Sequence, residues 1–451
     1  MLTHRMLMLL ALGFSTAPTQ AADKFTLRDD PSSGETWQVI VEVTGKGDFE
    51  FQPPDEKQKP VTHPVELAAS FRFLERRLPP AGRDEAAFRG LRHFEEARSQ
   101  IQVGGQSSAP NLREERSQIV ARATRAGIVS YSPAGPLTSM EVELLPFPGD
   151  PLVLAALLPD REVSVGETWT PDAWAGPAMA GTEVSLNQKT TCRLDSVRDG
   201  QATVSFTAQI DGATKGATSK TTLEGTLTFD VNADAVVAAK VTQTEKRSIG
   251  PLSPGMELTL TAVVERARAA SDEELSDAAV KAIPLEPEAS DLWIEYTAPF
   301  GVGLAGERGW RVFHQTDKLL ILRLLDHGGL IAQCNLAPAP TVPAGQRTPG
   351  RLLEDAVRKS LGEQFTEIVD TEELDMGGDA SVYRVTVSGK TKDAKRLWRY
   401  YLVTAPDGRQ AELVFTLEPD HLARLADRDL ELVSSLQFLS RPEPTPAGSE
   451  K

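Results

Sequence analysis

Alternation of apolar and polar residues dominates the chain from Gly34 to about Arg266. This period of two is typical of antiparallel strands that have one apolar and one solvated face. Asp199-Gly200 lies between two alternating runs and indicates a two-residue hairpin turn. The clearest alternating runs span 37–44, 65–73, 204–210, 223–229 and 256–264.

Helices are scarce in the same part of the chain. Asp84 is predicted to cap a helix that runs to about Arg98, and Asp150 with Pro151 predicts a short helix through Leu157, because Pro suits the first helical position. A large sheet must bury its apolar face, and two short helices cannot cover it. The sequence therefore predicts a mainly β fold, in which a large antiparallel sheet forms a sandwich or barrel or curls around a cavity.

The first 22 residues have the order of a secretory signal peptide. Arg5 precedes the apolar stretch Met6–Phe14, and the small residues around Thr19–Ala22 provide a cleavage site. The alternative is a buried N-terminal helix. The apolar stretch is shorter than the roughly 20 residues of a spanning helix, and no later stretch approaches that length. We therefore expect an exported protein, periplasmic or extracellular, that does not span the membrane.

Charge and cysteine content restrict the partners further. The net charge of −16 repels phosphate backbones, which argues against a nucleic-acid partner. The two cysteines, Cys192 and Cys334, are far apart in sequence. An oxidising compartment would permit a disulfide between them, but two unrelated buried thiols are the favoured reading, because free cysteine is among the most buried residue types.

The pattern changes after residue 268. Residues 269–290 are rich in acid and alanine and predict a linker with a short helix around 272–281; residues 291–440 predict an α+β domain, and 441–451 a disordered tail. Strands are expected at 292–298, 309–314, 318–325, 329–335, 366–374, 380–388, 395–404 and 410–417.

Two helices are expected to pack on this second sheet and complete an antiparallel-sheet/helix sandwich. One is predicted to be capped by Thr348, to open at Pro349 and to end at Gly362. The other is predicted to close the domain from about Asp420 to Leu436. The apolar side of the first helix is predicted to be formed by Leu352, Leu353, Ala356, Val357 and Leu361.

No motif indicates catalysis, a cofactor or a metal. Gly301–Gly306 matches G-x-G-x-x-G, but the residues that follow predict a strand where a dinucleotide site needs a helix. A flexible loop is the favoured reading. The acidic run Asp370–Asp379 lacks the spacing of a calcium loop and fits a solvated loop or strand edge better. We therefore expect a protein without enzymatic activity.

One basic run stands out in this acidic chain. Between residues 390 and 399 cationic residues surround a single acid, Asp393. On a hairpin tip they could contact an anionic partner or lipid head groups. The alternative, which we favour, is a charged strand edge that prevents aggregation. The cationic residues are Lys390, Lys392, Lys395, Arg396 and Arg399.

The segment Leu158–Trp169, LPDREVSVGETW, carries a family resemblance. It resembles the LP-x-x-x-V-x-V-G-x-x-W segment of a family of exported bacterial proteins of unknown function, which look like relatives of curled-sheet carriers typified by LolA. The resemblance covers about 24–268 and implies a curled sheet. The same segment also fits a purely structural role, with one strand face, a turn and a core anchor at Val163, Val165, Gly166 and Trp169.

Residues 291–440 resemble the PsbP-like fold. The resemblance rests on a loosened P-x-G-W entry at Pro299–Gly301 and Gly309-Trp310, and on the segments Thr348-Pro349, Tyr400–Val403 and Gln437-Phe438. Members of that fold bind partners or assist assembly, so this resemblance also implies a protein without catalysis.

Three hypotheses follow. The first is a cell-envelope protein that binds a lipid, another apolar ligand or an envelope protein partner in a curled N-terminal sheet. The second is a structural or interaction protein with a filled core. The third, remote, is a hydrolase with an unrecognised site. Side chains of medium size with few large aromatics on the N-terminal strands favour space inside the sheet.

Overall fold

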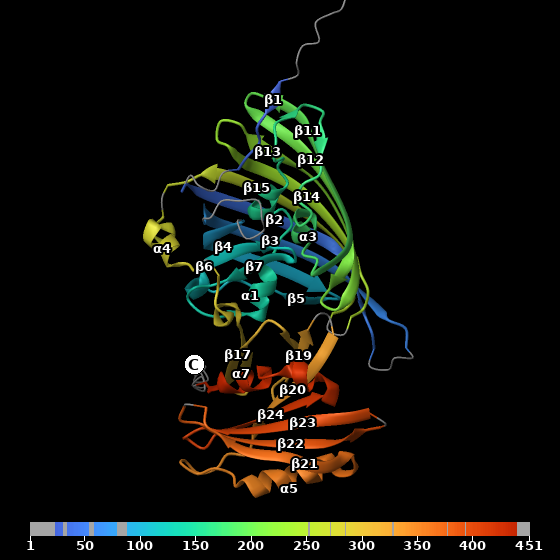
Figure 1. The fold of residues 1–451 in the computed structure, drawn as a ribbon, viewed down its shortest axis with the longest axis vertical. Helices are drawn as coiled ribbons and strands as arrows, with labels where there is room; N and C mark the ends of the chain where they lie inside the picture. The colour runs from blue at the N-terminus through green and yellow to red at the C-terminus, as the bar shows by residue number, and fades with distance from the viewer. Residues whose placement is uncertain are drawn as a thin grey trace, which may run out of the picture.

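The computed structural model describes residues 23–439, except 30–33, 54–57, 79–87, 251–252, 271, 285, 327–328, 377 and 393. The expected signal peptide, 1–22, and the expected tail, 441–451, lie outside the described residues. A strongly curved sheet occupies one end of the molecule, and the smaller C-terminal layers occupy the other (Figure 1).

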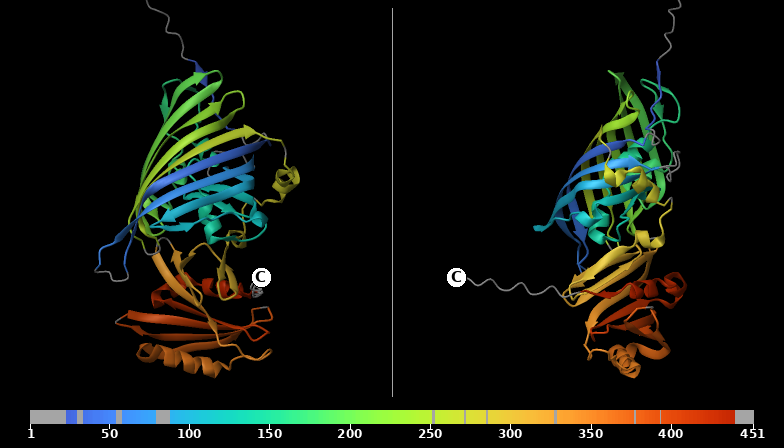
Figure 2. Two further views of the ribbon diagram at one scale, coloured as in Figure 1. Left: turned by 180° about the vertical axis from the view of Figure 1, so that it is seen from behind. Right: turned by 90° about the vertical axis from the view of Figure 1, so that its left-hand side faces the viewer.

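The curved sheet has twelve strands, all antiparallel, and is not closed into a barrel. From behind, its long strands run obliquely side by side across the outer face (Figure 2). In spatial order the path is β10 (Thr168–Trp169), β11 (Val184–Arg198), β12 (Gln201–Thr214), β13 (Ala217–Asp230), β14 (Ala235–Arg247), β15 (Gly255–Arg268), β2 (Thr36–Phe51), β3 (Val61–Arg77), β4 (Arg89–Val103), β6 (Gln118–Thr124) and β7 (Gly127–Tyr131), with β5 (Gln106–Ser108) beside β4.

The mainly β prediction is confirmed, and each alternating run lies in one of these strands. The hairpin turn is also confirmed, because Arg198 pairs with Gln201 and the two residues between them, Asp199 and Gly200, have φ of 51° and 78°. Positive φ at both central residues gives a turn whose twist matches that of the flanking strands.

The helix predicted to end at Arg98 is wrong, because residues 89–103 form strand β4. Leu91, Phe94 and Ala97 are all buried at a helix-like spacing of three. Leu91 packs on one face of the strand, in a cluster with Leu275, and Phe94 packs on the other. A β-bulge opposite Arg72 and Phe73 then shifts the alternation by one residue, so Ala97 returns to the side of Phe94. Asp84 lies outside the described residues.

Three short helices cover the inner face of the curved sheet: α1 (Ser139–Leu144), α2 (Pro151–Ala156) and α3 (Ala175–Ala180). The helix predicted at Pro151 is confirmed, with the Asp150 side chain accepting a hydrogen bond from the amide of Leu152. The expectation of few large aromatics inside the sheet is wrong. The inner core contains Phe71, Phe73, Phe94, Phe147, Trp169, Trp174, Phe206 and Phe229.

The segment Leu158–Trp169 packs at the edge of this core. Val163 pairs with Phe25 in a two-stranded sheet of β1 (Lys24–Phe25) and β9 (Val163–Ser164). The Trp169 indole is buried and donates to the Leu157 carbonyl at 2.8 Å. Val165 is 52% exposed, so Val163 and Val165 do not share a buried strand face as predicted. The chain turns at Gly166, with φ of 89°.

The second part of the chain forms two further sheets. The larger has the order β18 (Trp310–Thr316), β19 (Leu319–Asp326), β20 (Gly329–Ala339), β24 (Gln410–Leu417), β23 (Ala394–Thr404), β22 (Ser381–Thr391) and β21 (Phe365–Leu374). The smaller has the order β25 (Gln437–Phe438), β17 (Val302–Gly306), β16 (Ile294–Ala298) and β8 (Leu137–Thr138). The short helices between and after the sheets are η3 (Glu114–Arg116), η4 (Glu273–Leu275), α4 (Asp277–Ala282), η5 (Ala289–Leu292), η6 (Gly362–Gln364) and η7 (Pro419–His421).

Helices pack on both faces of the larger sheet, which agrees with the predicted sheet/helix layers. Helix α5 (Gly350–Leu361) buries Leu353 and Val357 against one face. Helices α6 (Leu422–Leu425) and α7 (Arg428–Ser434) contribute buried leucines to the core on the other face. Among the described residues, no helix is long and apolar enough to cross a membrane.

Several local predictions in this part are wrong. Thr348 does not cap α5, because its hydroxyl donates to Gln410 Oε1 at 3.0 Å. Leu352 is 60% exposed, because the buried side of α5 is narrower than predicted. The closing helix is broken into α6 and α7 at Ala426, where φ is 48°. The glycine motif does not form a flexible loop, because Gly301 lies in a turn with φ of 82° and the rest of the motif forms strand β17.

A strand pairing joins the two parts of the chain. β8 lies in sequence between β7 and β10, two strands of the large sheet, but pairs in parallel with β16 of the smaller C-terminal sheet. Arg113 reinforces the junction, because its guanidinium lies 2.8 Å from Glu141 Oε1 and 3.1 Å from Glu295 Oε2. Helix α1 follows β8 directly, so it lies between the curved sheet and the C-terminal layers.

Candidate ligand cavity on the inner face of the sheet

An apolar cavity of about 270 Å³ lies between the inner face of the curved sheet and α1. Its sheet wall follows from strand alternation, because Leu67, Ala69 and Phe71 are successive inward residues of β3. The remaining lining residues are Val43, Ser99, Ile101, Ser108, Pro110, Met140, Glu143, Leu144, Pro146, Phe147, Pro148 and Leu260.

Helix α1 is fixed in place by a capping box. Thr138 accepts from the amide of Glu141, and Glu141 Oε2 accepts from the amide of Thr138 at 2.7 Å. Burial alone would raise the pKa of Glu141, but hydrogen bonds from Arg113 and Thr138 outweigh burial and lower it. The anchored helix presents Met140 and Leu144 to the cavity.

The loop at 146–148 separates this cavity from a second one of about 120 Å³ beneath α3. Pro146, Phe147, Pro148 and Leu260 line both. The Phe147 ring lies 4.9 Å from the ring of Phe71, centroid to centroid, so the partition between the two cavities is a side-chain contact.

A buried ionic network holds the end of this loop. Arg92 is fully buried and donates to both Asp150 oxygens at 2.6 and 2.8 Å and to Glu75 Oε2 at 2.8 Å. Asp29 belongs to the same network, because Arg77 lies 3.5 Å from Glu75 and 4.0 Å from Asp29, and Arg266 lies 2.8 Å from Asp29. Burial alone would raise the pKa of Asp29, but the charges of Arg266 and Arg77 outweigh burial and lower it. These arginines and carboxylates neutralise one another, so the network positions the loop and offers no free acid or base.

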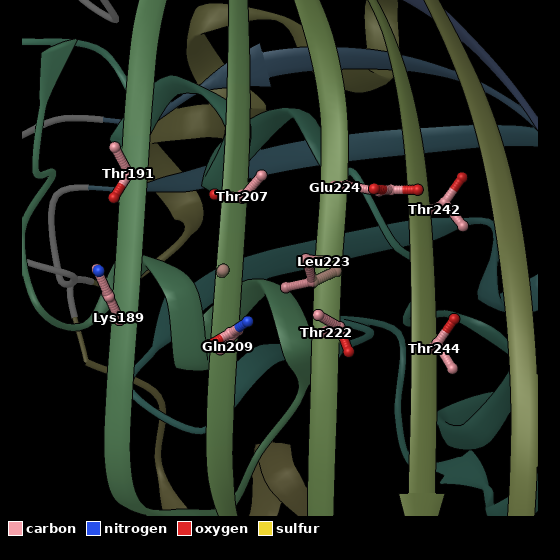
Figure 3. Close-up of a pocket in the computed structure, with 10 residues that line it drawn as sticks. Lys189, Thr191, Thr207, Gln209, Thr222, Leu223, Glu224, Thr242 and Thr244 are labelled. Carbon is pink, nitrogen blue, oxygen red and sulfur yellow. The ribbon is translucent and has the colours of Figure 1, made fainter.

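A larger depression of about 540 Å³ lies on the outer face of the same sheet. Figure 3 shows its side chains on neighbouring strands, with the helices behind the sheet. They are the outward residues of β11 to β14, among them Thr207, Gln209, Thr222 and Glu224. Threonine, glutamine, lysine and glutamate side chains make up most of its lining, whereas apolar side chains make up most of the lining of the inner cavity, so the inner cavity is the better candidate site for an apolar molecule.

The basic run does not form one cationic surface. Arg399 lies 2.7 Å from the buried Asp429, and Arg396 lies 2.9 Å from Glu418, so both are paired internally. Lys390, Lys392 and Lys395 are exposed at the β22–β23 hairpin and remain available to an anionic partner.

The cysteines and the acidic run have structural positions. Cys192 and Cys334 are free, buried and in separate cores, so the disulfide that the sequence allowed is not formed. Residues 370–374 lie on the edge strand β21, where Asp370 and Glu372 pair with Arg384. Within the described ranges no group of three or more His, Cys, Asp or Glu side chains could hold a metal ion.

Sequence reasoning did not identify the cavity-lining residues. Met140, Leu144 and Phe147 come from a segment without strand periodicity, and they meet β3 and β4 only through the tertiary fold. The one available signal was the inward alternation of β3, which predicts the wall but not the space in front of it.

Residues 154–236 match a family of unknown function (DUF6263). The match extends from α2 to the start of β14 and includes the segment Leu158–Trp169. No curated protein matches the chain.

Solved structures resemble parts of the chain. A Bacteroides thetaiotaomicron protein is 13% identical over 33% of this chain, which spans 48% of that protein, with a TM-score of 0.24. Cyanobacterial PsbP (CyanoP) from Synechocystis is 15% identical over 32% of this chain and 92% of its own, with a TM-score of 0.26. DynF of the dynemicin pathway of Micromonospora chersina is 9% identical over 56% of this chain and 91% of its own, with a TM-score of 0.15. Scores this low carry no argument about function.

Proposed function

We propose that this protein is a non-catalytic, exported protein of the cell envelope that holds an apolar ligand, or an apolar segment of a protein partner, against the inner face of its curved sheet. The observation that carries the proposal is the apolar cavity of about 270 Å³ between β3 and α1. The order of residues in 1–22 supports export.

The surroundings of the cavity support binding over catalysis. The lining is mainly apolar, and its one carboxylate, Glu143, is paired with Lys215 at 2.7 Å. The nearest ionisable network, around Arg92, is closed by its own ion pairs. The LolA-like resemblance of Leu158–Trp169 belongs to the same proposal, since such carriers have a curled sheet.

A second candidate is a structural or interaction protein with a filled core. The aromatic side chains on the inner face favour it, because Phe71, Phe73, Phe94 and Phe147 occupy much of the space that the curvature creates. The two candidates differ in whether the remaining cavity accepts a ligand.

Titration with an environment-sensitive apolar dye, N-phenyl-1-naphthylamine, tests the proposal. We expect saturable binding at one site per chain, and loss of that binding in Ala69→Phe, which places a ring in the cavity. Ser99→Leu is a second filling variant on β4. The matched control, Thr222→Phe, adds the same ring to the outer depression and should bind dye normally. Equal binding by wild type and both filling variants, all folded, would favour the filled-core candidate.

A further inference from the structure

A cleft of about 610 Å³ lies between the rim of the curved sheet and strand β18. It adjoins the apolar cavity, because Met140 and Glu143 of α1 line both spaces. Its apolar lining includes Phe49, Met140, Val184 and Val312, and its charged lining consists of Lys215, Arg247, Arg308, Arg311, Glu143 and Glu183.

Two of the four cations in the cleft have a carboxylate beside them. Lys215 Nζ lies 2.7 Å from Glu143 Oε1. Arg247 Nε lies 3.8 Å from Glu245 Oε1, behind the lining. The charges of these two cations are therefore balanced by the protein itself.

Arg308 and Arg311 form no ion pair among the described residues, although the charge of Arg311 helps to lower the pKa of Glu143, whose own ion-pair partner is Lys215. The guanidinium of Arg308 donates to the backbone carbonyls of Leu292 and Ser130, which accept hydrogen bonds but carry no charge. The side chain of Arg311 makes no hydrogen bond or ion pair within the described part of the chain. Burial and the charge of Arg311 lower the pKa of Arg308 to about 10. Two like charges facing a partly enclosed space are stabilised by an anion placed between them.

The sizes of the two spaces constrain the ligand. Small-molecule sites in proteins enclose about 300–1,000 Å³, and the apolar cavity alone, at about 270 Å³, falls just below that range. Met140 and Glu143 line both spaces, so a ligand larger than the cavity reaches the cleft past Met140. The part of such a ligand in the cavity contacts apolar side chains, and the part in the cleft meets Arg308 and Arg311, which form no ion pair among the described residues.

We propose that the ligand is an anionic amphiphile, whose apolar chain lies in the inner cavity and whose carboxylate or phosphate head lies between Arg308 and Arg311. This inference rests on the proposed function and names its ligand class. A free inorganic anion would pair with the arginines equally well but would gain no binding free energy from the apolar cavity. The test therefore compares an amphiphile with a free anion.

Displacement of N-phenyl-1-naphthylamine from residues 23–451 compares decyl phosphate, decan-1-ol and inorganic phosphate. We expect decyl phosphate to bind at least about tenfold more tightly than decan-1-ol, because charge-assisted hydrogen bonds are the strong ones. Arg311→Gln should remove that advantage and leave decan-1-ol affinity unchanged, and Arg311→Lys should restore part of it. The matched control Arg193→Gln, at an exposed arginine of β11, should behave as wild type.

The outcomes separate the two claims. Equal affinity for decyl phosphate and decan-1-ol, with no effect of Arg311→Gln, overturns the head-group site and leaves the apolar cavity standing. Failure of both amphiphiles to displace dye, or of dye to bind, overturns the proposed function itself. Binding of inorganic phosphate as tight as that of decyl phosphate, measured by calorimetry, also overturns the amphiphile.

Discussion

Arg92 Nη2 lies 2.6 Å from Asp150 Oδ1, and both side chains are buried inside the curved sheet. This pair joins strand β4 to the first turn of α2, which follows the loop that closes the ligand cavity. The cation also stacks on Phe73, with 4.8 Å between the guanidinium carbon and the ring centroid. The stability of the cavity wall therefore depends on a charge pair that water does not reach.

Asp150→Asn should destabilise the protein by about 3 kcal/mol or more, because removing one partner leaves part of a buried charge unbalanced. Asparagine caps helices as well as aspartate does, so the change isolates the charge. The shift of the urea midpoint measures it. The matched control is Glu66→Gln in the exposed pair with Lys46, which should cost less than about 1 kcal/mol. Equal shifts for the two variants would contradict this account.

Asp29 should make stability depend on pH in the acid range. Its folded pKa lies below the ordinary value of 3.8, so its contribution is fully present above that value and is lost as pH falls through the folded pKa. Urea midpoints measured between pH 6 and pH 2 should therefore fall less steeply for Asp29→Asn than for wild type. Asp211→Asn, at an exposed position on β12, should keep the wild-type slope. Parallel curves for wild type and Asp29→Asn would refute the prediction.

The basic run should divide into structural and exposed residues. Arg399→Met should cost about 3 kcal/mol, because Asp429 is fully buried and would lose its cation. Lys395→Met, at an exposed position on the same strand, should change stability by less than about 0.5 kcal/mol. Urea unfolding of both variants provides the measurement, and a large effect of Lys395→Met would argue for an unrecognised contact.

Both thiols should be unreactive in the folded protein. Burial raises the pKa of Cys192 to about 12, and burial with the charge of Asp429 raises that of Cys334 well above its ordinary value. A disulfide-exchange reagent at pH 8 should therefore detect no fast-reacting thiol in the native protein and two after unfolding without reductant. If no thiol were detected after unfolding, the two cysteines would be joined by a disulfide, which would contradict the structure.

The sequence predicted the strands well because the apolar residues of each alternating run are the ones that the fold buries. Val39, Val41 and Val43 face one core and their neighbours face solvent, so periodicity alone places them. The prediction failed at β4, where the bulge opposite Phe73 and burial on both faces gave Leu91, Phe94 and Ala97 a helical spacing. Local patterns cannot reveal that the linker around Leu275 covers the outer face.

The candidate site could not be predicted from the sequence, for a related reason. Met140 and Arg311 are 171 positions apart in the printed chain, and they meet only because β8 pairs with β16. The pairing is short, and no periodic pattern marks Leu137 and Thr138 as a strand. The basic run was noticed because its charges are contiguous, although Arg396 and Arg399 turned out to be paired within the fold.

Native mass spectrometry of residues 23–451, exported to the periplasm of a bacterial host and purified without detergent, tests the central claim most directly. The account predicts a species heavier than the apoprotein by one small molecule with an apolar chain, which organic extraction releases and which Ala69→Phe no longer retains. A clean apoprotein mass for wild type, together with no binding of N-phenyl-1-naphthylamine, would contradict the ligand cavity.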